Sequence, residues 1–512
     1  MPDDRSTPTG QITVSNLTCG LLSLNGMEWG NDGFLYGPRW FNGEVVRVDV
    51  DSGEFTTVAD GFRVPAALKF DSLGQLFVLD TGAGEVIKVD AATGEKAVFA
   101  TLSSGLDNLA FDAEDRLFVS SFTDGSIVDV FADGTTRSVS PPGLISPGGV
   151  TTLSGPDGDS LYIADLFSLR EYDADSGELK QLVPAVLGVS DLYMPTTVAA
   201  DGEDLLLTSW PDNVVWTWDT ETDTLLAEYK NVEMPLNAIR FNDDLVVAEL
   251  GTGSVVQLDG PTPEDRITLV DGLVMPAGLA ALDGAMWVSD AATGQVLQIA
   301  RDGEILAEPI PVAHDLAGPE GLAVIDDQNL LVVEAGAGRL SYIELESGAV
   351  RALATDLALG LVSPTAVPTA FYNGVAVGRD GTIFVTGDLA NVLYRIESPF
   401  SAGVDAEDIL GVWHVLGVDF DFYHKFYDDG TFHAGDSPEM LDEQPLAIGE
   451  YWFNEGNLMM VELEVFEIPP CGEEPAVYAA ELLDSGNLAL TLIQDDCEPR
   501  IGSTAREHEP VR

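Results

Sequence analysis

Basic residues are scarce in this sequence. Its 512 residues include 23 Lys and Arg but 86 Asp and Glu, for a formal net charge of −63. A field of this sign repels nucleic acid and anionic membrane surfaces, and it attracts cations and cationic ligands. A solvating acidic surface, as in salt-adapted proteins, has the same composition. The charge therefore excludes classes of partner without identifying one.

Long apolar runs and helical periodicity are also lacking. No apolar run approaches 18 residues, which predicts no membrane-spanning helix. The N-terminal "MPDDRSTPTG" has neither a basic segment nor an apolar core, so we expect no signal peptide in this chain. The hydrophobic content of 45% nevertheless predicts a globular protein.

Three cysteines are too few for a disulfide-rich scaffold. Cys471 and Cys497 could pair, which would favour an extracytoplasmic location, and Cys19 would be left over; the compartment stays unassigned. The sequence has no G-x-S-x-G, H-E-x-x-H, C-x-x-C or phosphate-binding glycine loop. The enzyme classes that depend on those motifs are excluded.

A short phrase recurs instead: a small or polar residue, an apolar strand, and a second strand that usually ends in Asp or Glu. It reads "LNGMEW", "PAALKF", "LDNLAF", "PGGVTT", "PTTVAA", "LNAIRF", "PAGLAA", "PEGLAV" and "YNGVAV". The residues before the strand are Asn25, Ala66, Asp107, Gly148, Thr196, Asn237, Ala277, Glu320 and Asn373. The first three steps are 41 residues each, which indicates a true repeat.

Each copy predicts four short antiparallel strands joined by glycine-rich turns, and units of this length are typical of β-propeller blades. We therefore expect an all-β fold with a single propeller over residues 11–399. It would have nine four-stranded blades, or eight if one of the longer copies is irregular. The ninth copy supplies only three strands, so "QITVSN" (11–16) is predicted to add the fourth and close the ring.

A second domain is expected over residues 409–512, after a flexible N-terminus (1–10) and a linker (400–408). Its seven or eight aromatic-rich strands predict a small antiparallel β-barrel. Gly411-Val412-Trp413 resembles the G-x-W of lipocalins, with Arg500 as the arginine that would cover the tryptophan. A barrel of this size is often filled by its own side chains, so the motif does not predict a bound ligand, and the partner expected for this domain is a protein.

Two sets of side chains are expected at one mouth of the propeller channel. The polar members of the first set, before the inner strands, are Asn25, Asp107, Asn237, Glu320 and Asn373. The second set, at the end of each second strand, is Arg39, Asp80, Ser121, Asp165, Trp210, Glu249, Asp290, Glu334 and Asp388. For each acid of the second set, the alternative is that its carboxylate only caps a turn.

The repeats resemble the senescence-marker, gluconolactonase and paraoxonase propellers, with kinship to NHL-type repeats. "PEGLAV" resembles the family's Glu-containing phrase, "LNGMEW" and "YNGVAV" its Asn-Gly phrase, and "LDNLAFD" the Asp-Asn pair of the paraoxonase branch. The resemblance implies a divalent cation in the channel, usually calcium, held by Glu, Asn and Asp. Carboxylate and amide oxygens are the ligands that calcium prefers.

That family has six blades, and nine would make a wider channel, with a radius of about 14 Å if inner strands lie about 10 Å apart. Only near neighbours could then share an ion. The expected metal ligands are Glu320, Asn373 and Asn25, which are consecutive across the ring closure. Asp107 would lie two blades further on, and Asn237 nearly opposite.

Histidine is nearly absent from the propeller, where only His314 occurs, whereas paraoxonase-like lactonases use a His pair. General-base catalysis is therefore assigned to Glu334 or Asp388, whose pKa an acidic, buried mouth would raise. Arg39 would anchor a substrate carbonyl or carboxylate, or else form a structural ion pair.

These residues predict a hydrolase that depends on calcium or another divalent cation and acts on a small-molecule lactone or related ester. The alternatives are a noncatalytic propeller that binds a ligand or a protein, and a metal-assisted lyase. A lactone panel with and without chelator, a structure of the channel, and product analysis distinguish the three.

Overall fold

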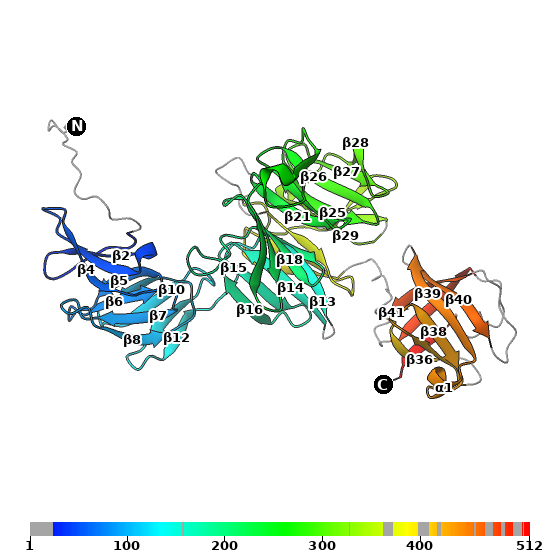
Figure 1. The fold of residues 1–512 in the computed structure, drawn as a ribbon, viewed down its shortest axis with the longest axis horizontal. Helices are drawn as coiled ribbons and strands as arrows, with labels where there is room; N and C mark the ends of the chain where they lie inside the picture. Colours follow the sequence, from blue (N-terminus) through cyan, green and yellow to red (C-terminus); the bar gives the residue numbers. More distant parts are fainter. Residues whose placement is uncertain are drawn as a thin grey trace, which may run out of the picture. The chain divides into compact units, whose positions relative to one another are not determined.

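The computed structural model describes residues 24–155, 158–326, 328–361, 372–397, 409–416, 421–454, 457–465, 475–482, 487–494, 504 and 506–511. Nearly all of its regular structure is antiparallel β-sheet, as predicted (Figure 1). The short helices among these residues are α1 (Met440–Glu443), η1 (Trp40–Asn42), η2 (Pro263–Asp265) and η3 (Ala335–Ala337). No described helix is long and apolar enough to cross a membrane. All three cysteines lie outside the described residues.

The predicted repeat is confirmed as nine successive sheets before the barrel, eight with four strands and the ninth with three. The first three sheets contain β1 (Glu28–Trp29), β2 (Leu35–Arg39), β3 (Glu44–Val48), β4 (Phe55–Asp60); β5 (Pro65–Phe70), β6 (Leu76–Asp80), β7 (Glu85–Val89), β8 (Lys96–Thr101); β9 (Leu106–Phe111), β10 (Leu117–Ser121), β11 (Ile127–Val130) and β12 (Thr136–Ser140).

The next three sheets follow the same order, with the inner strand first. They contain β13 (Val150–Gly155), β14 (Gly158–Asp165), β15 (Ser168–Asp173), β16 (Leu179–Pro184); β17 (Thr197–Asp201), β18 (Asp204–Ser209), β19 (Val214–Asp219), β20 (Thr224–Tyr229); β21 (Pro235–Phe241), β22 (Asp244–Glu249), β23 (Ser254–Leu258) and β24 (Arg266–Val270).

The last three sheets end the repeat region. They contain β25 (Pro276–Leu282), β26 (Ala285–Asp290), β27 (Gln295–Arg301), β28 (Glu304–Ala313); β29 (Pro319–Val324), β30 (Asn329–Glu334), β31 (Arg339–Glu344), β32 (Ala349–Ala354); β33 (Val375–Val377), β34 (Ile383–Gly387) and β35 (Val392–Ile396). The fourth strand predicted for the ninth sheet, residues 11–16, lies outside the described residues.

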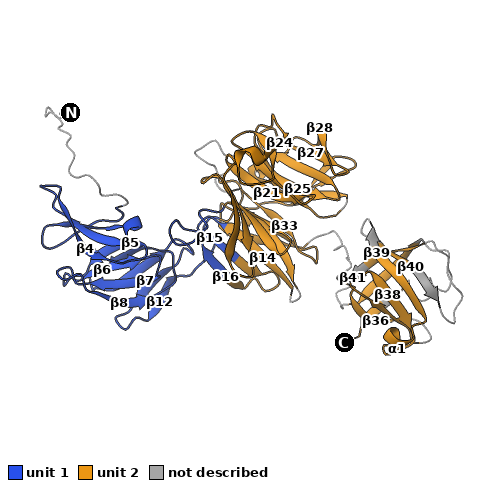
Figure 2. Ribbon diagram, in the orientation of Figure 1, with its two compact units in different colours: residues 1–146, 165–170, 181–195 blue, residues 147–164, 171–180, 196–512 orange. Residues whose placement is uncertain are grey.

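The chain divides into two compact units (Figure 2). Unit 1 contains residues 1–146, 165–170 and 181–195, and unit 2 contains residues 147–164, 171–180 and 196–512. Within unit 1, the first three sheets pack in series: β1 and β2 of the first sheet contact β5, and β5 contacts β9.

The inner strands of six sheets form a closed ring in unit 2, and this differs from the single nine-membered ring that the repeat count predicted. Their inner strands pack in the order β13, β17, β21, β25, β29, β33, and β33 then packs against β13. The closure is hydrogen-bonded: the Thr386 hydroxyl donates to the Gly148 carbonyl, and the Thr152 hydroxyl donates to the Val377 carbonyl at 2.8 Å.

Glycines explain why six sheets suffice for closure. A Cβ atom on Gly374 would lie 2.7 Å from the Val150 nitrogen, and one on Gly149 would lie 2.6 Å from the Val198 nitrogen. On Gly278, a Cβ would lie only 2.2 Å from the Glu320 carbonyl oxygen. Because no side chain fits at these positions, neighbouring inner strands approach closely enough to complete a narrow ring.

The predicted C-terminal barrel is confirmed as eight antiparallel strands that close on themselves. They are β36 (Gly411–Val415), β37 (Tyr423–Phe426), β38 (Thr431–Gly435), β39 (Ala447–Asn454), β40 (Asn457–Val465), β41 (Ala476–Leu482), β42 (Leu488–Gln494) and β43 (Glu507–Pro510). Trp413 is buried in its core with Phe426, Phe432 and Tyr478, so side chains pack the interior. Arg500, predicted to cover Trp413, lies outside the described residues.

Candidate functional site

Glu320 and Asn373 meet at one end of the six-sheet ring, as expected for adjacent repeats. Glu320 is on β29 and Asn373 comes just before β33, and both side chains are buried. Glu320 Oε2 accepts the Asn373 backbone N–H at 2.7 Å and its side-chain N–H at 2.8 Å. This arrangement directs a carboxylate and an amide to the same point of the ring.

Asp388 extends this pair. It follows β34, and its backbone N–H points at Asn373 Oδ1 at 3.5 Å. Asp388 Oδ2 accepts the Leu361 N–H at 3.0 Å, but Oδ1 is buried and has no hydrogen-bond partner in the part of the chain that the structure describes. Burial raises the pKa of the Asp388 carboxyl, while the Leu361 and Gly360 amides and the Asn373 side chain oppose the shift.

The donor atoms of this trio suit a hard cation. Glu320, Asn373 and Asp388 offer carboxylate and amide oxygens and no thiolate or imidazole, which is the chemistry of calcium sites. A buried carboxylate oxygen without a partner carries a free-energy penalty that a bound cation would remove. The described residues contain no group of three or more His, Cys, Asp and Glu placed to hold a metal, so any site here depends on amide oxygens as well.

Asn237 lies on the wall of the ring's central cavity, which has a volume of about 410 Å³. Its Oδ1 accepts the N–H of Leu279 at 3.3 Å, from the neighbouring inner strand. The other described lining residues are mostly aliphatic side chains and glycines, together with Thr151, Thr152 and Tyr372. Asn237 is two sheets from Glu320 around the ring.

Tyr372 and an apolar cluster cover this end of the ring. Tyr372 packs with Leu236, Ala277 and Ala291, and its backbone has a φ of 50°, which is uncommon for a bulky residue. Burial raises the pKa of the Tyr372 hydroxyl, and the nearby Glu320 carboxylate adds to the effect. The polar trio is therefore shielded from bulk water.

The carboxylate of Glu334 is held in place by hydrogen bonds from neighbouring residues. Arg339 donates to both of its carboxylate oxygens at 2.7 and 2.8 Å, the Ser341 hydroxyl donates at 2.6 Å, and the Ala317 N–H donates at 2.9 Å. Burial alone would raise the pKa of Glu334, but these donors lower it below its ordinary value. A carboxylate held in this way is a poor general base.

The other acids of the second set show the same bonding. Asp80 accepts the N–H groups of Arg63 and Val64, and Asp290 accepts those of Val274 and Met275. In each case the carboxylate holds the backbone that leads into the inner strand of its own sheet. These two carboxylates therefore cap backbone N–H groups, which was the alternative role for the acids of the second set.

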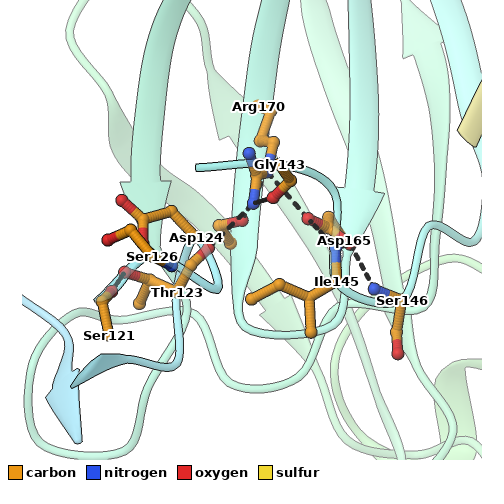
Figure 3. Close-up of polar contacts among 10 residues, drawn as sticks. Ser121, Thr123, Asp124, Ser126, Gly143, Ile145, Ser146, Asp165 and Arg170 are labelled. Atoms are coloured by element: carbon orange, nitrogen blue, oxygen red, sulfur yellow. Dashed lines mark hydrogen bonds and ion pairs between the residues drawn. The ribbon is translucent and has the colours of Figure 1, made fainter. Parts of the chain in front are cut away.

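Asp165 is the most buried example (Figure 3). It accepts the N–H groups of Ile145 and Ser146 and lies 2.8 Å from Arg170, whose guanidinium also donates to the Gly143 carbonyl. Both charges are inaccessible to solvent, so this pair belongs to the internal structure of unit 1.

Three predicted site residues belong to unit 1. Arg39 forms an ion pair with Glu44 at 2.5 Å, which is the structural alternative considered for it. Asn25 is exposed and accepts the N–H of Gly26, and Asp107 is exposed on β9. In the closed ring, the sheet next to Asn373 is the fourth, where Gly148 occupies the register position of Asn25.

Comparison with known proteins places part of the chain. Residues 15–166 match the family described as SMP-30/Gluconolactonase/LRE-like region. No curated protein matches the chain. Among solved structures, it is similar to virginiamycin B lyase from Staphylococcus aureus, with 14% identity, 62% of this chain and 94% of that chain covered, and a TM-score of 0.23.

A second similar structure is the extracellular domain of a hybrid two-component system from B. thetaiotaomicron, with 12% identity, 91% of this chain and 79% of that chain covered, and a TM-score of 0.34. The family resemblance that the repeats predicted is thus confirmed for one stretch: over residues 15–166 this chain matches the SMP-30/gluconolactonase/LRE-like family.

Proposed function

We propose that the six-sheet ring of unit 2 binds a divalent cation, Ca²⁺ or one of similar chemistry, and hydrolyses a lactone or related ester. Glu320, Asn373 and Asp388 would hold the ion. The observation that supports this most directly is the Oδ1 atom of Asp388, buried beside Asn373 with no described partner. When bound, such an ion supplies Lewis-acid polarisation of a carbonyl.

The individual side chains have separate roles in this proposal. Asp388, which the sequence suggested as a general base, is assigned to the ion instead, because a carboxylate that a cation holds ionised is a poor proton acceptor. Asn373 fixes the Glu320 carboxylate through two hydrogen bonds, which keeps that oxygen oriented. Asn237 on the cavity wall would contact the substrate. Glu334 is left out of the chemistry because Arg339 and Ser341 already engage its carboxylate.

The first experiment measures metal and turnover in the same preparations. Purified full-length protein is analysed for bound metals, then assayed on a broad lactone panel before and after chelation. We expect Glu320→Gln and Asn373→Ala to lose bound metal and turnover together. Glu346→Gln, the same kind of change at an exposed position between β31 and β32, serves as the matched control.

Two results would contradict the proposal. Metal retained at the wild-type level in both site variants would remove the assigned ligands. Absence of turnover on every lactone and ester, with metal present and with metal removed, would remove the hydrolase. Analysis of any product also separates hydrolysis from elimination by a lyase.

A noncatalytic binding propeller is the second candidate, and one observation favours it. The apolar cluster of Tyr372 with Leu236, Ala277 and Ala291 covers the end of the ring that contains the polar trio. Under this alternative the ion, if bound, stabilises the ring without reacting. Chelation would then lower the melting temperature while no substrate is turned over.

A further inference from the structure

Unit 1 contains a pocket of about 530 Å³ that the proposed chemistry does not use. Every described residue that lines it belongs to unit 1. Five aromatic side chains come together there from separate stretches of the chain. They are Trp40, Phe41, Phe122, Phe167 and Tyr193. A volume of this order suits a small organic molecule.

Local structure explains how the aromatic walls assemble. Trp40 and Phe41 begin the short helix η1 after β2, and the Trp40 indole N–H donates to the Leu187 carbonyl at 3.1 Å. Phe122 and Phe167 pack edge to face, with ring centroids 5.7 Å apart. The walls are therefore held by contacts between segments distant in the sequence.

Two residues of the first set contribute a side-chain amide and a carboxylate to this pocket. Asn25 and Asp107 both line it, and Asp107 is the only charged residue among the described lining residues. Burial raises the pKa of the Asp107 carboxyl and a hydrogen bond from Ser120 opposes this. The Asp107 side chain is exposed, and no ion pair among the described residues involves it.

A metal ion is poorly matched to these walls, since calcium requires six to eight oxygen ligands and aromatic rings supply none. An organic cation is well matched. Aromatic faces attract an alkylammonium group, the single carboxylate compensates its charge, and the net charge of −63 raises cation concentration near the surface. A neutral apolar ligand would leave the Asp107 carboxylate partly desolvated without compensation.

One basic side chain contacts the loop that supplies part of the wall. The Arg63 guanidinium donates to the carbonyls of Gly82 and Val189 at 2.9 and 3.2 Å. It is not a lining residue, and the Asp80 carboxylate receives two backbone bonds next to it. Its guanidinium is therefore engaged by backbone oxygens.

We infer that this pocket binds a small organic cation of the alkylammonium class, with aromatic walls around the cationic group and Asp107 as its counter-charge. The inference concerns unit 1 and is independent of any reaction in the ring of unit 2. Its test is therefore a binding measurement and not an activity assay.

The probe is choline, and the control ligand is 3,3-dimethylbutan-1-ol, which has nearly the same shape and no charge. Both are titrated into the full-length protein by calorimetry at 150 mM salt, which screens nonspecific attraction. We expect choline to bind at least about fivefold more tightly than the alcohol, the ratio that an ion pair of about 1 kcal/mol provides.

Two variants separate the two contributions. Asp107→Asn should weaken choline about fivefold, and Phe122→Leu about threefold through the lost aromatic face, while the alcohol is unaffected by Asp107→Asn. Glu95→Gln removes an exposed acid of unit 1 outside the pocket and should leave choline binding unchanged. Phe41→Leu, at a residue 61% exposed, repeats the aromatic test with little effect on folding.

The inference is overturned if choline fails to bind or binds no better than the alcohol. It is equally overturned if Asp107→Asn behaves like Glu95→Gln. If Ca²⁺ is the cation whose binding Asp107→Asn abolishes, with choline indifferent to the change, the pocket is a metal site and the inference is wrong.

Discussion

The histidine pair in the C-terminal barrel should make that domain sensitive to acid. His424 on β37 and His508 on β43 are both buried, and His424 Nδ1 lies 3.1 Å from His508 Nε2. His508 Nδ1 is 3.0 Å from the Arg506 carbonyl and must donate to it. His508 Nε2 is therefore the acceptor of the N–H of His424, and a proton added there would break the bond.

Burial lowers the pKa of His508 to about 4. Hydrogen bonds from its imidazole to the Arg506 and Leu488 backbone partly oppose this shift, and the nearby His414 adds to it. Burial, and then the neighbouring His508, lowers the pKa of His424 well below its ordinary value. Because the folded-state pKa lies below the unfolded value of about 6.5, the unfolded chain binds protons first as pH falls. The stability that the neutral pair provides is thus complete above pH 6.5 and declines towards pH 4.

The size of the effect follows from the same shift. For His508 alone, the loss is about 2 kcal/mol by pH 5 and about 3 kcal/mol below pH 4. Most carboxylates are still ionised at pH 5, so this pH separates histidine titration from general acid unfolding. Phe422 and Phe432 pack against the His424 ring and offer no counter-charge to an imidazolium.

The assay has two parts, both on the full-length chain. Carbon-13 NMR of labelled histidines measures the individual pKa values, and urea unfolding at pH 7.5 and 5.0 measures the change in barrel stability. The double variant His424→Leu/His508→Leu should lose this pH dependence, and His314→Gln, at an exposed histidine, should keep it. A His508 pKa near 6.5, or equal pH dependence in the double variant, would refute the reasoning.

Three further predictions concern buried charges. Arg170→Met leaves the Asp165 carboxylate buried without its cation and should lower the free energy of unfolding of unit 1 by about 3–5 kcal/mol in urea, and a loss below about 1 kcal/mol would contradict this. Glu334→Gln breaks the ion pair with Arg339 and should cost about 1–2 kcal/mol of stability while bound metal and any lactone turnover are unchanged; lost turnover in a folded variant would restore Glu334 as a base. Asp388→Asn replaces a carboxylate that would hold the cation and should lower bound metal and any lactone turnover together, and metal retained at the wild-type level in a folded variant would exclude that role.

The repeat was predictable because strands, turns and hydrophobic alternation are local properties. Nine copies of one phrase correspond to nine sheets, and the aromatic-rich segment after them corresponds to the barrel. Closure is a different kind of property, because it depends on how closely inner strands of separate sheets approach. The alignment of the nine recurring phrases treated every copy alike, and it therefore predicted that all nine sheets belong to one ring.

A partial signal for closure was present in the sequence. The residue after the aligned position is glycine in the first, fourth, seventh, eighth and ninth copies, which are Gly26, Gly149, Gly278, Gly321 and Gly374. A Cβ on each of the last four would lie within 2.7 Å of another backbone, whereas a Cβ on Gly26, in unit 1, would lie 3.5 Å from the nearest atom. The fifth and sixth copies have Thr197 and Ala238 at this position and also belong to the ring. Glycine here permits the close approach of ring sheets, but the residue type alone does not distinguish them from the sheets of unit 1.

The candidate site was predictable only in part, for the same reason. Glu320 and Asn373 come from adjacent sheets in either ring, so their contact did not depend on the ring size. Placing Asn25 beside them required nine sheets in one circle, whereas the ninth sheet packs against the fourth. Asn25 and Asp107 instead line one pocket of unit 1, because their shared register places them at the same end of the first and third sheets.

Regular repetition of an acid is itself an argument about its role. Asp80 and Asp290 recur at the same register with the same task of holding the backbone before an inner strand. Asp388 performs that task with Oδ2, yet its Oδ1 is buried and unused by the described residues. If the acid served only to hold the backbone, both of its carboxylate oxygens should have hydrogen-bond donors in every copy. The departure of one copy from that pattern, beside Glu320 and Asn373, is therefore a stronger indication of a bound cation than the acidity of the ring as a whole.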